Sequence, residues 1–125
     1  MNLLLDAHVL LWWQGDFERI GKEALGAIEN TDNIIWVSAA TVWEISIKKA
    51  LGKLTLPDKW YESIQEDGFR ELPITWSAAK LAGELPKHHS DPFDRMLIAQ
   101  AVQNGLILVT HDDIIRSYDI STFRT

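Results

Sequence analysis

Four carboxylate side chains stand where an apolar run of this sequence ends or where a predicted helix begins. They are Asp6, Glu44, Asp94 and Asp112. Carboxylates within about 6 Å of one another raise one another's pKa, so a cluster of them cannot stay ionised unaided. A hard divalent cation resolves that conflict, and ligation by oxygen alone favours Mg²⁺ or Mn²⁺. Such a centre deprotonates water and neutralises charge on a phosphodiester oxygen, so the implied chemistry is phosphodiester hydrolysis.

The elements that must position these acids are short apolar β runs separated by helices. The runs are 2–5, 34–37 and 106–109, and they are typical of strands buried on both faces. Their alternation with helical stripes predicts an α/β fold with a mainly parallel central sheet covered on both faces. Ligands bind such sheets outside the carboxyl ends of the strands. Asp6 and Asp112, which follow two of these runs, are therefore expected at one edge.

The helix that carries Asp94 has its own start signals. Asp91 is a good N-cap, and Pro92 suits the first helical position because its missing N–H would be unpaired there. Apolar residues then recur every fourth position from Phe93, which predicts a helix that packs on the core over a broad face and ends at Gly105. A right-handed crossover begins this helix at the carboxyl edge, so Asp94 should join the other acids.

The remaining elements are predicted from periodicity and turn residues. We expect helices over 9–13, 20–28, 39–51, 58–67 and from Thr75 or Ser77 to Glu84. Gly52 should end the third of these helices, and Asp58 should cap the fourth. Short β segments are expected over 69–74 and 120–123. Trp36 and Trp43 are assigned to the core, and at least one of Trp12 and Trp13 is expected to face a partner.

Each acid also has a local explanation that requires no shared site. Glu44 matches a capping box with Thr41, or it can pair with Lys48 one turn later. Asp6 can cap the short helix after it, and Asp94 can complement a helix dipole. These explanations do not predict that the acids converge, whereas a shared metal site predicts it for all of them.

Composition limits the class of protein. The chain has 125 residues, 14.2 kDa, 46% hydrophobic residues and no cysteine, which fits one domain over 1–125 and excludes thiolate chemistry. No segment resembles a signal peptide or reaches the roughly 18 apolar residues of a membrane span, so we expect a cytoplasmic protein. The net charge of −6 disfavours a protein that coats nucleic acid but is compatible with a nuclease that clusters carboxylates.

The acids and their flanking residues resemble the PIN domain, and more narrowly the VapC-type toxins of bacterial type II toxin-antitoxin systems. The resemblance rests on Asp6 after a leucine run, Trp43-Glu44-Ile45, Asp91-Pro92-Phe93-Asp94-Arg95, Ile98-Ala99-Gln100-Ala101 and Thr110-x-Asp112. It spans the chain from the first strand to beyond Asp112, and the Asp91–Arg95 motif is its most specific part.

The resemblance implies an endoribonuclease on a three-layer α/β/α sandwich that depends on Mg²⁺ or Mn²⁺. It implies that Asp6, Glu44, Asp94 and Asp112 are the metal-binding and catalytic acids, with Thr110 supporting the last of them. It further implies a homodimer that is inhibited by a cognate antitoxin whose tail enters the active-site groove. Ala7 departs from the family, because a Thr or Ser commonly follows the first acid, and His8 is a candidate to compensate.

Other polar residues near these motifs remain open candidates. Lys48, Lys49 and Lys53 form a basic cluster that can guide an RNA backbone or end a solvated helix. Arg95 can clamp a phosphate or pair with an acid. His88 and His89 can bind phosphate or shuttle a proton, although solvated loop residues are the favoured interpretation, and His111 is expected nearer the site. The choice between Asp112 and Asp113 stays open, although the Thr110-x-Asp112 pattern favours Asp112.

Three rival functions share some of these features. A DNA-directed or structure-selective PIN nuclease has the same acids and differs in its substrate groove. A degenerate RNA-binding PIN domain without catalysis is disfavoured by the intact acid set. A phosphoacceptor signalling domain also places acids at the carboxyl edge of a parallel sheet, but Glu44 and Asp94 do not fit its pattern. The RNA target, the number of metal ions and the identity of the antitoxin cannot be predicted from the sequence.

Overall fold

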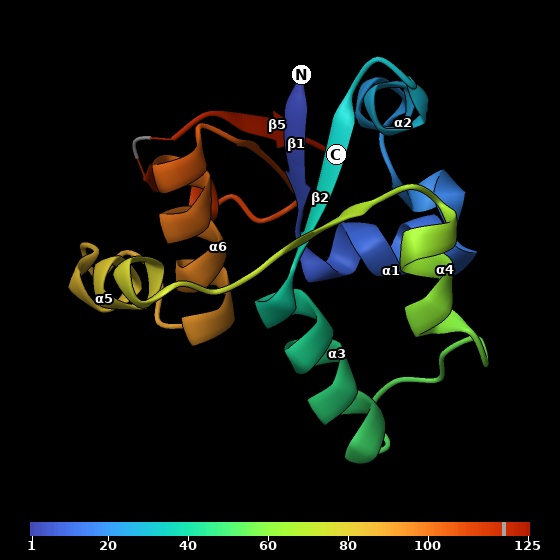
Figure 1. The fold of residues 1–125 in the computed structure, drawn as a ribbon, viewed down its shortest axis with the longest axis horizontal. Helices are drawn as coiled ribbons and strands as arrows, with labels where there is room; N and C mark the ends of the chain where they lie inside the picture. The colour runs from blue at the N-terminus through green and yellow to red at the C-terminus, as the bar shows by residue number, and fades with distance from the viewer. Residues whose placement is uncertain (119) are drawn as a thin grey trace.

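The computed structural model describes residues 1–118 and 120–125, with Arg116 and Arg124 described by their backbone alone. Its centre is one parallel sheet in the order β3-β2-β1-β4-β5 (Figure 1). The strands are β1 (Asn2–Leu5), β2 (Ile34–Ser38), β3 (Arg70–Leu72), β4 (Ile107–Thr110) and β5 (Thr122–Arg124). The prediction of a mainly parallel sheet is thereby confirmed.

Helices cover both faces of this sheet and make three layers. They are α1 (Ala7–Gly15), α2 (Lys22–Glu29), α3 (Ala39–Ala50), α4 (Trp60–Glu66), α5 (Trp76–Glu84) and α6 (Pro92–Asn104), with 3-10 turns at Phe17–Arg19 and Ile115–Ser117. In Figure 1, α5 and α6 lie on one side of the sheet, and α1, α2 and α4 lie on the other. No helix in the described part of the chain is both long enough and apolar enough to cross a membrane.

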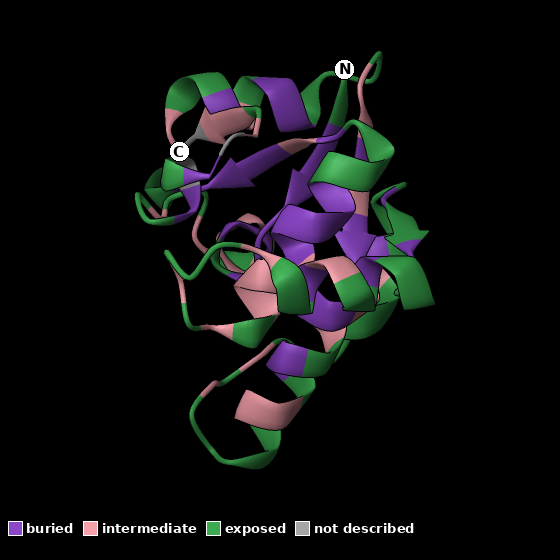
Figure 2. Cartoon of the chain, turned by 90° about the vertical axis from the view of Figure 1, so that its left-hand side faces the viewer, coloured by how far each residue is buried: buried purple, intermediate pink, exposed green. Residues whose placement is uncertain are grey.

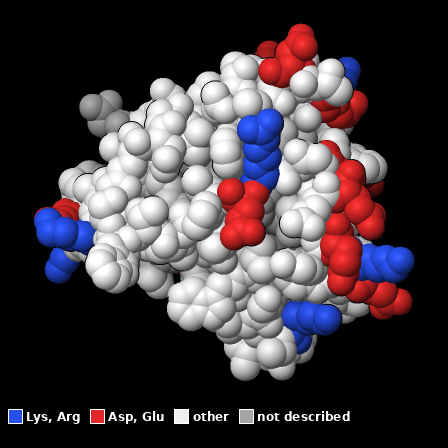
Figure 3. All heavy atoms as spheres, in the orientation of Figure 1, with Lys and Arg blue, Asp and Glu red and all other residues white. Residues whose placement is uncertain are grey.

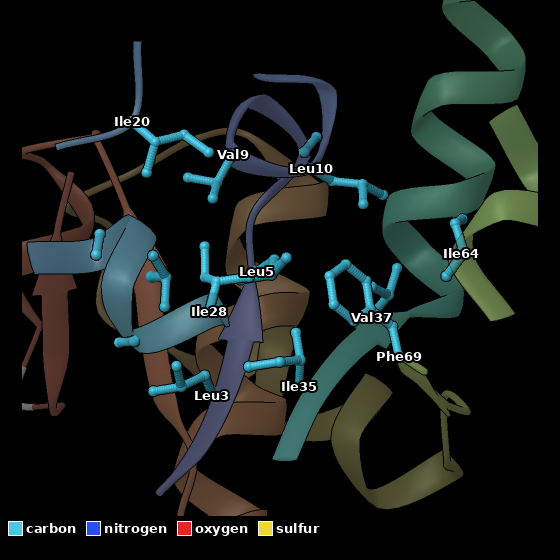
Figure 4. Packing of buried hydrophobic residues seen from close by; sticks show 14 of the residues in the cluster. Leu3, Leu5, Val9, Leu10, Ile20, Ile28, Ile35, Val37, Ile64 and Phe69 are labelled. Carbon is cyan, nitrogen blue, oxygen red and sulfur yellow. The ribbon is translucent and has the colours of Figure 1, made fainter. Parts of the chain in front are cut away.

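The core has two halves, because successive side chains of a strand point to opposite faces. Leu3 and Leu5 of β1 pack with residues of α1, α2 and α4 on one face, and several of these side chains are seen in Figure 4. Leu4 points to the other face, against Leu97 and Ile98 of α6. The inner strands are almost entirely buried, as Figure 2 shows, which explains why their sequences read as continuous apolar runs.

The carboxyl ends of β1 and β4 form the edge of the sheet at which the acids were predicted to meet. These strands are neighbours, with Leu5 opposite Val109, and the Asp6 N–H donates to the Val109 carbonyl at 3.1 Å. In Figure 1, β1 and β2 run side by side to this edge, from which α1 and α3 begin. Residues that follow these strands therefore meet at one place.

Several predicted boundaries and caps are confirmed. Asp91 caps α6 with Pro92 in the first turn, and Thr75 caps α5 by accepting from the Ala78 N–H. Gly52 and Gly105 follow their helices in the left-handed region, at φ of 72° and 62°, a conformation that glycine adopts without steric cost.

Other local predictions are wrong. Ser38 caps α3, so Thr41 lies inside the helix and no capping box with Glu44 forms. The residue before α4 is Lys59 rather than Asp58, and no side chain caps that helix. Trp43 was assigned to the core but is 61% exposed, with its ring against Phe93 at a centroid distance of 5.3 Å. The apolar periodicity of a helix does not show how wide its buried face is, and Trp43 lies outside the buried face of α3.

Candidate metal centre at the carboxyl edge of the sheet

Asp6 is a buried acid at the end of β1. Its side chain is N-cap of α1, where Oδ1 accepts from the Val9 N–H at 2.9 Å. The residue is 4% exposed, and burial raises the pKa of Asp6, whereas hydrogen bonds from the Thr110 side chain and the Val9 N–H act in the opposite direction. The predicted local capping role is therefore confirmed, yet capping alone does not require so buried a carboxylate.

Asp94 lies in the first turn of α6, and its pKa is strongly perturbed. Its pKa is raised from 3.8 to about 7, first by burial and then by the charge of Asp91, with Asp6 and Glu44 adding to the rise and His89 opposing it. A charge raises a neighbour's pKa only where the two are close enough to interact. Asp6, Glu44 and Asp94 thus form one electrostatic group, as the sequence predicted.

Asp112 follows the end of β4 and lies beside the same group of acids. Its N–H donates to Thr110 Oγ1 at 3.0 Å, and its Oδ1 accepts from the Ile114 N–H at 2.8 Å. Its Oδ2 lies 3.0 Å from His89 Nε2, whereas Asp113 is exposed. Asp112 is therefore the acid that faces the cluster.

Thr110 connects the first and last acids. It is fully buried, its side chain hydrogen-bonds Asp6, and its Oγ1 accepts from the Asp112 N–H. Ala7 carries no hydroxyl, so Thr110 supplies one to Asp6 from the neighbouring strand. His8 is exposed, with its ring 6.1 Å from that of Trp12.

Glu44 is buried on α3, one turn before Lys48. Its Oε2 accepts from Lys48 Nζ at 2.8 Å, which confirms the predicted pair. That pair is compatible with a place in the site, because Glu44 still raises the pKa of Asp94. Thr41 lies one turn earlier, and its buried hydroxyl has no hydrogen-bond partner among the described residues.

For His89, the favoured interpretation as a solvated loop residue is wrong. It is not solvated: its side chain is 13% exposed, and Nε2 lies 2.9 Å from Asp94 Oδ2 and 3.0 Å from Asp112 Oδ2. The potential ligand atoms of these three residues all lie within 4.8 Å of one another. Its position two residues before the Asp91 cap is the only signal that could have indicated this role. His88 is exposed, as expected, with its ring 4.9 Å from that of Tyr118.

Arg95 is not available for a phosphate, because all five of its N–H donors are used. They bind five backbone carbonyls between the end of α5 and the start of α6: those of Ala82, Gly83, Leu85, Pro86 and His89. The side chain therefore holds the 82–89 segment against α6. His111 is exposed and packs against Trp12, with its Nδ1 3.3 Å from the Thr125 carbonyl oxygen.

The arrangement fits a divalent cation. Asp6 and Glu44, which come from other elements, raise the pKa of Asp94, and a cation would offset that repulsion. Carboxylate oxygens are the donors that Mg²⁺ and Mn²⁺ take in proteins. The hydrogen-bonded turns around Asp6, Asp94 and Asp112 hold these donors in place before any ion arrives.

Comparison with known proteins identifies the family. A model of the PIN domain matches residues 3–121. The chain is 34% identical over 121 residues to Ribonuclease VapC22 of Mycobacterium tuberculosis, covering 94% of this chain and 92% of that protein. VapBC2 from Rickettsia felis, bound to promoter DNA, has a chain that superimposes with a TM-score of 0.73 at 12% identity, with 100% and 99% of the two chains covered. VapBC-1 from nontypeable Haemophilus influenzae gives 0.71 at 18% identity, with 99% and 98% covered. With its parallel sheet and its acids at the carboxyl edge, this chain belongs to the PIN domain family.

Proposed function

We propose that this protein is a metal-dependent endoribonuclease and the toxin of a toxin-antitoxin pair. The observation that carries the proposal is the convergence of acids from separate elements: Asp94 and Asp112 lie 2.9 and 3.0 Å from the same His89 nitrogen, and Asp6 and Glu44 are close enough to Asp94 to raise its pKa. Their place at the carboxyl edge of a parallel sheet supports a catalytic site. The relative at 34% identity is named a ribonuclease, which supports RNA as the substrate.

Asp6, Glu44, Asp94 and Asp112 would hold Mg²⁺ or Mn²⁺. Such an ion supplies an activated water and neutralises charge on the phosphodiester. Thr110 positions two of these acids, since its side chain bonds Asp6 and its Oγ1 accepts from the Asp112 N–H. Burial of Asp6 and Glu44 excludes water from one side of the site and strengthens the local electrostatics.

Basic residues at the end of α3 are candidates to bind the RNA backbone. Lys48 is already paired with Glu44, so Lys49 and Lys53, which are exposed, are better placed to contact phosphates. In the view of Figure 3, acidic side chains gather over α4, a surface that would repel RNA. We therefore propose that RNA approaches along α3 rather than over α4.

The α3–α4 face is our candidate for the protein partner. A cavity of about 190 Å³ lies there, with Val37, Val42, Tyr61, Ile64 and Phe69 in its lining. Solved structures that share this fold include a member of the VapBC family of toxin-antitoxin systems from Mycobacterium tuberculosis, VapBC-5. We propose that an antitoxin with apolar anchors and basic flanks binds this face in the cytoplasm, and that the toxin forms a homodimer.

Cleavage of a cellular RNA pool tests the activity. Purified protein is incubated with Mg²⁺, with Mn²⁺ and with EDTA, beside Asp94→Asn and the matched control Asp113→Asn. We expect metal-dependent cuts that persist in the control and are lost in Asp94→Asn. Cuts that survive both EDTA and Asp94→Asn would refute the proposal, and cleavage of single-stranded DNA in place of RNA would favour the DNA-directed alternative.

A further inference from the structure

The ring of His89 has a defined hydrogen-bond partner at each nitrogen. Nδ1 faces the Asp91 backbone N–H at 3.3 Å, and Nε2 lies between the carboxylates of Asp94 and Asp112. A backbone N–H can only donate, so Nδ1 is an acceptor and carries no proton. The neutral ring therefore carries its proton on Nε2, which hydrogen-bonds Asp112 Oδ2 at 3.0 Å and lies 2.9 Å from Asp94 Oδ2.

The backbone of His89 is held as firmly as its ring. Its N–H donates to the Tyr118 hydroxyl oxygen at 3.0 Å, and that hydroxyl donates to the Pro86 carbonyl at 2.7 Å. Its carbonyl accepts from Arg95 Nη1 at 3.2 Å. Tyr118 is buried, so this segment is anchored to the core and to α6. Such anchoring fixes the position of a side chain before a ligand arrives.

We propose that His89 is a positioning residue of the metal centre. Its Nε2–H hydrogen-bonds Asp112 Oδ2 and lies against Asp94 Oδ2, so the ring holds two carboxylates from different elements of the fold around one point. A carboxylate has about four lone-pair sites, so the contacts with His89 leave capacity for a cation. His89 thus stays outside the metal's own ligands. This inference rests on the proposed function, because it concerns the same metal site.

Metal affinity gives the test, and it does not depend on cleavage. Mn²⁺ is titrated calorimetrically into the full chain after EDTA treatment and dialysis, for the wild type, His89→Ala, His89→Gln and His88→Ala. We expect about 10–100-fold weaker binding for His89→Ala, as for lost outer-shell partners of metal ligands. His89→Gln keeps an N–H donor and should lose only a few-fold. His88→Ala is the matched control and should bind like the wild type.

The tautomer is read by ¹⁵N NMR of the imidazole in metal-free and Mg²⁺-loaded protein. We expect the proton on Nε2 in both states. Loss of that proton on loading, or His89→Gln as weak as His89→Ala, would identify a direct ligand and overturn the proposal. Unchanged affinity of His89→Ala would also overturn it. A wild type that binds Mn²⁺ without cutting RNA refutes the ribonuclease alone, and one that binds no Mn²⁺ refutes both.

Discussion

The substitution Asp94→Asn should stabilise the metal-free protein, and increasingly so as the pH rises. The folded protein binds the Asp94 proton up to about pH 7, whereas the unfolded chain releases it near 3.8. Between these values the folded state holds more protons, so its stability falls as the pH rises. Asn cannot ionise and should escape this loss.

The size of the effect follows from the same pKa difference. The rise from 3.8 to about 7, at about 1.36 kcal/mol for each pKa unit, sets a ceiling of about 4 kcal/mol on the cost of ionising Asp94. The gain of Asp94→Asn over the wild type should be small at about pH 4. It should grow through about pH 7 and then level off.

Urea unfolding in EDTA at several pH values between about 4 and 8 measures this gain. Asp32→Asn, at an exposed acid in a turn, is the matched control and should change stability by only a few tenths of a kcal/mol at any pH. A gain for Asp94→Asn that is independent of pH, or a loss that grows with pH, would refute the reasoning. Added Mg²⁺ should stabilise the wild type more than the variant, because only the wild type keeps the full charge of the site.

Three other substitutions test the support around the site, each by urea unfolding. Arg95→Met leaves the carbonyls that Arg95 binds without donors and should cost about 2–3 kcal/mol, and an unchanged stability would contradict its bracing role. Gly105→Ala places a side chain at φ 62° and should cost about 1–2 kcal/mol. Gly26→Ala, within helix α2, should instead stabilise by about 0.5–1 kcal/mol, although an added Cβ meets no atom at either position. Equal effects of the two substitutions would refute backbone strain at Gly105. Lys48→Met leaves the buried Glu44 carboxylate without its partner and should cost about 1–3 kcal/mol, so an unchanged stability would contradict the structural role of this pair.

Much of the fold was predictable because its strands are buried on both faces. Leu3 to Leu5 face helices on two sides, so the sequence shows a continuous apolar run with an acid at its end. Chain direction in a parallel sheet then locates Asp6 at the carboxyl edge without further information. The Asp91 cap and Gly105 gave α6 its boundaries, since both act through local backbone geometry.

What was missed depends on contacts between distant residues. His89 enters the site because Tyr118 and Arg95 hold its backbone, and neither contact has a sequence signature. Arg95 looked free to bind phosphate because a run of backbone carbonyls is invisible in sequence. Trp43 looked like a core residue from its type, but its place on α3 turns it outward. Tertiary packing decides such cases, and local pattern cannot.

The position of a bound Mn²⁺ tests most directly whether these acids form one metal centre. Crystals of the EDTA-treated, Mn²⁺-loaded protein would be measured for anomalous scattering at the manganese edge. We predict density bordered by the carboxylates of Asp94 and Asp112, with Asp6 and Glu44 around it and His89 outside the ligand shell. Manganese bound only elsewhere, or only at Asp113, would contradict the proposed centre.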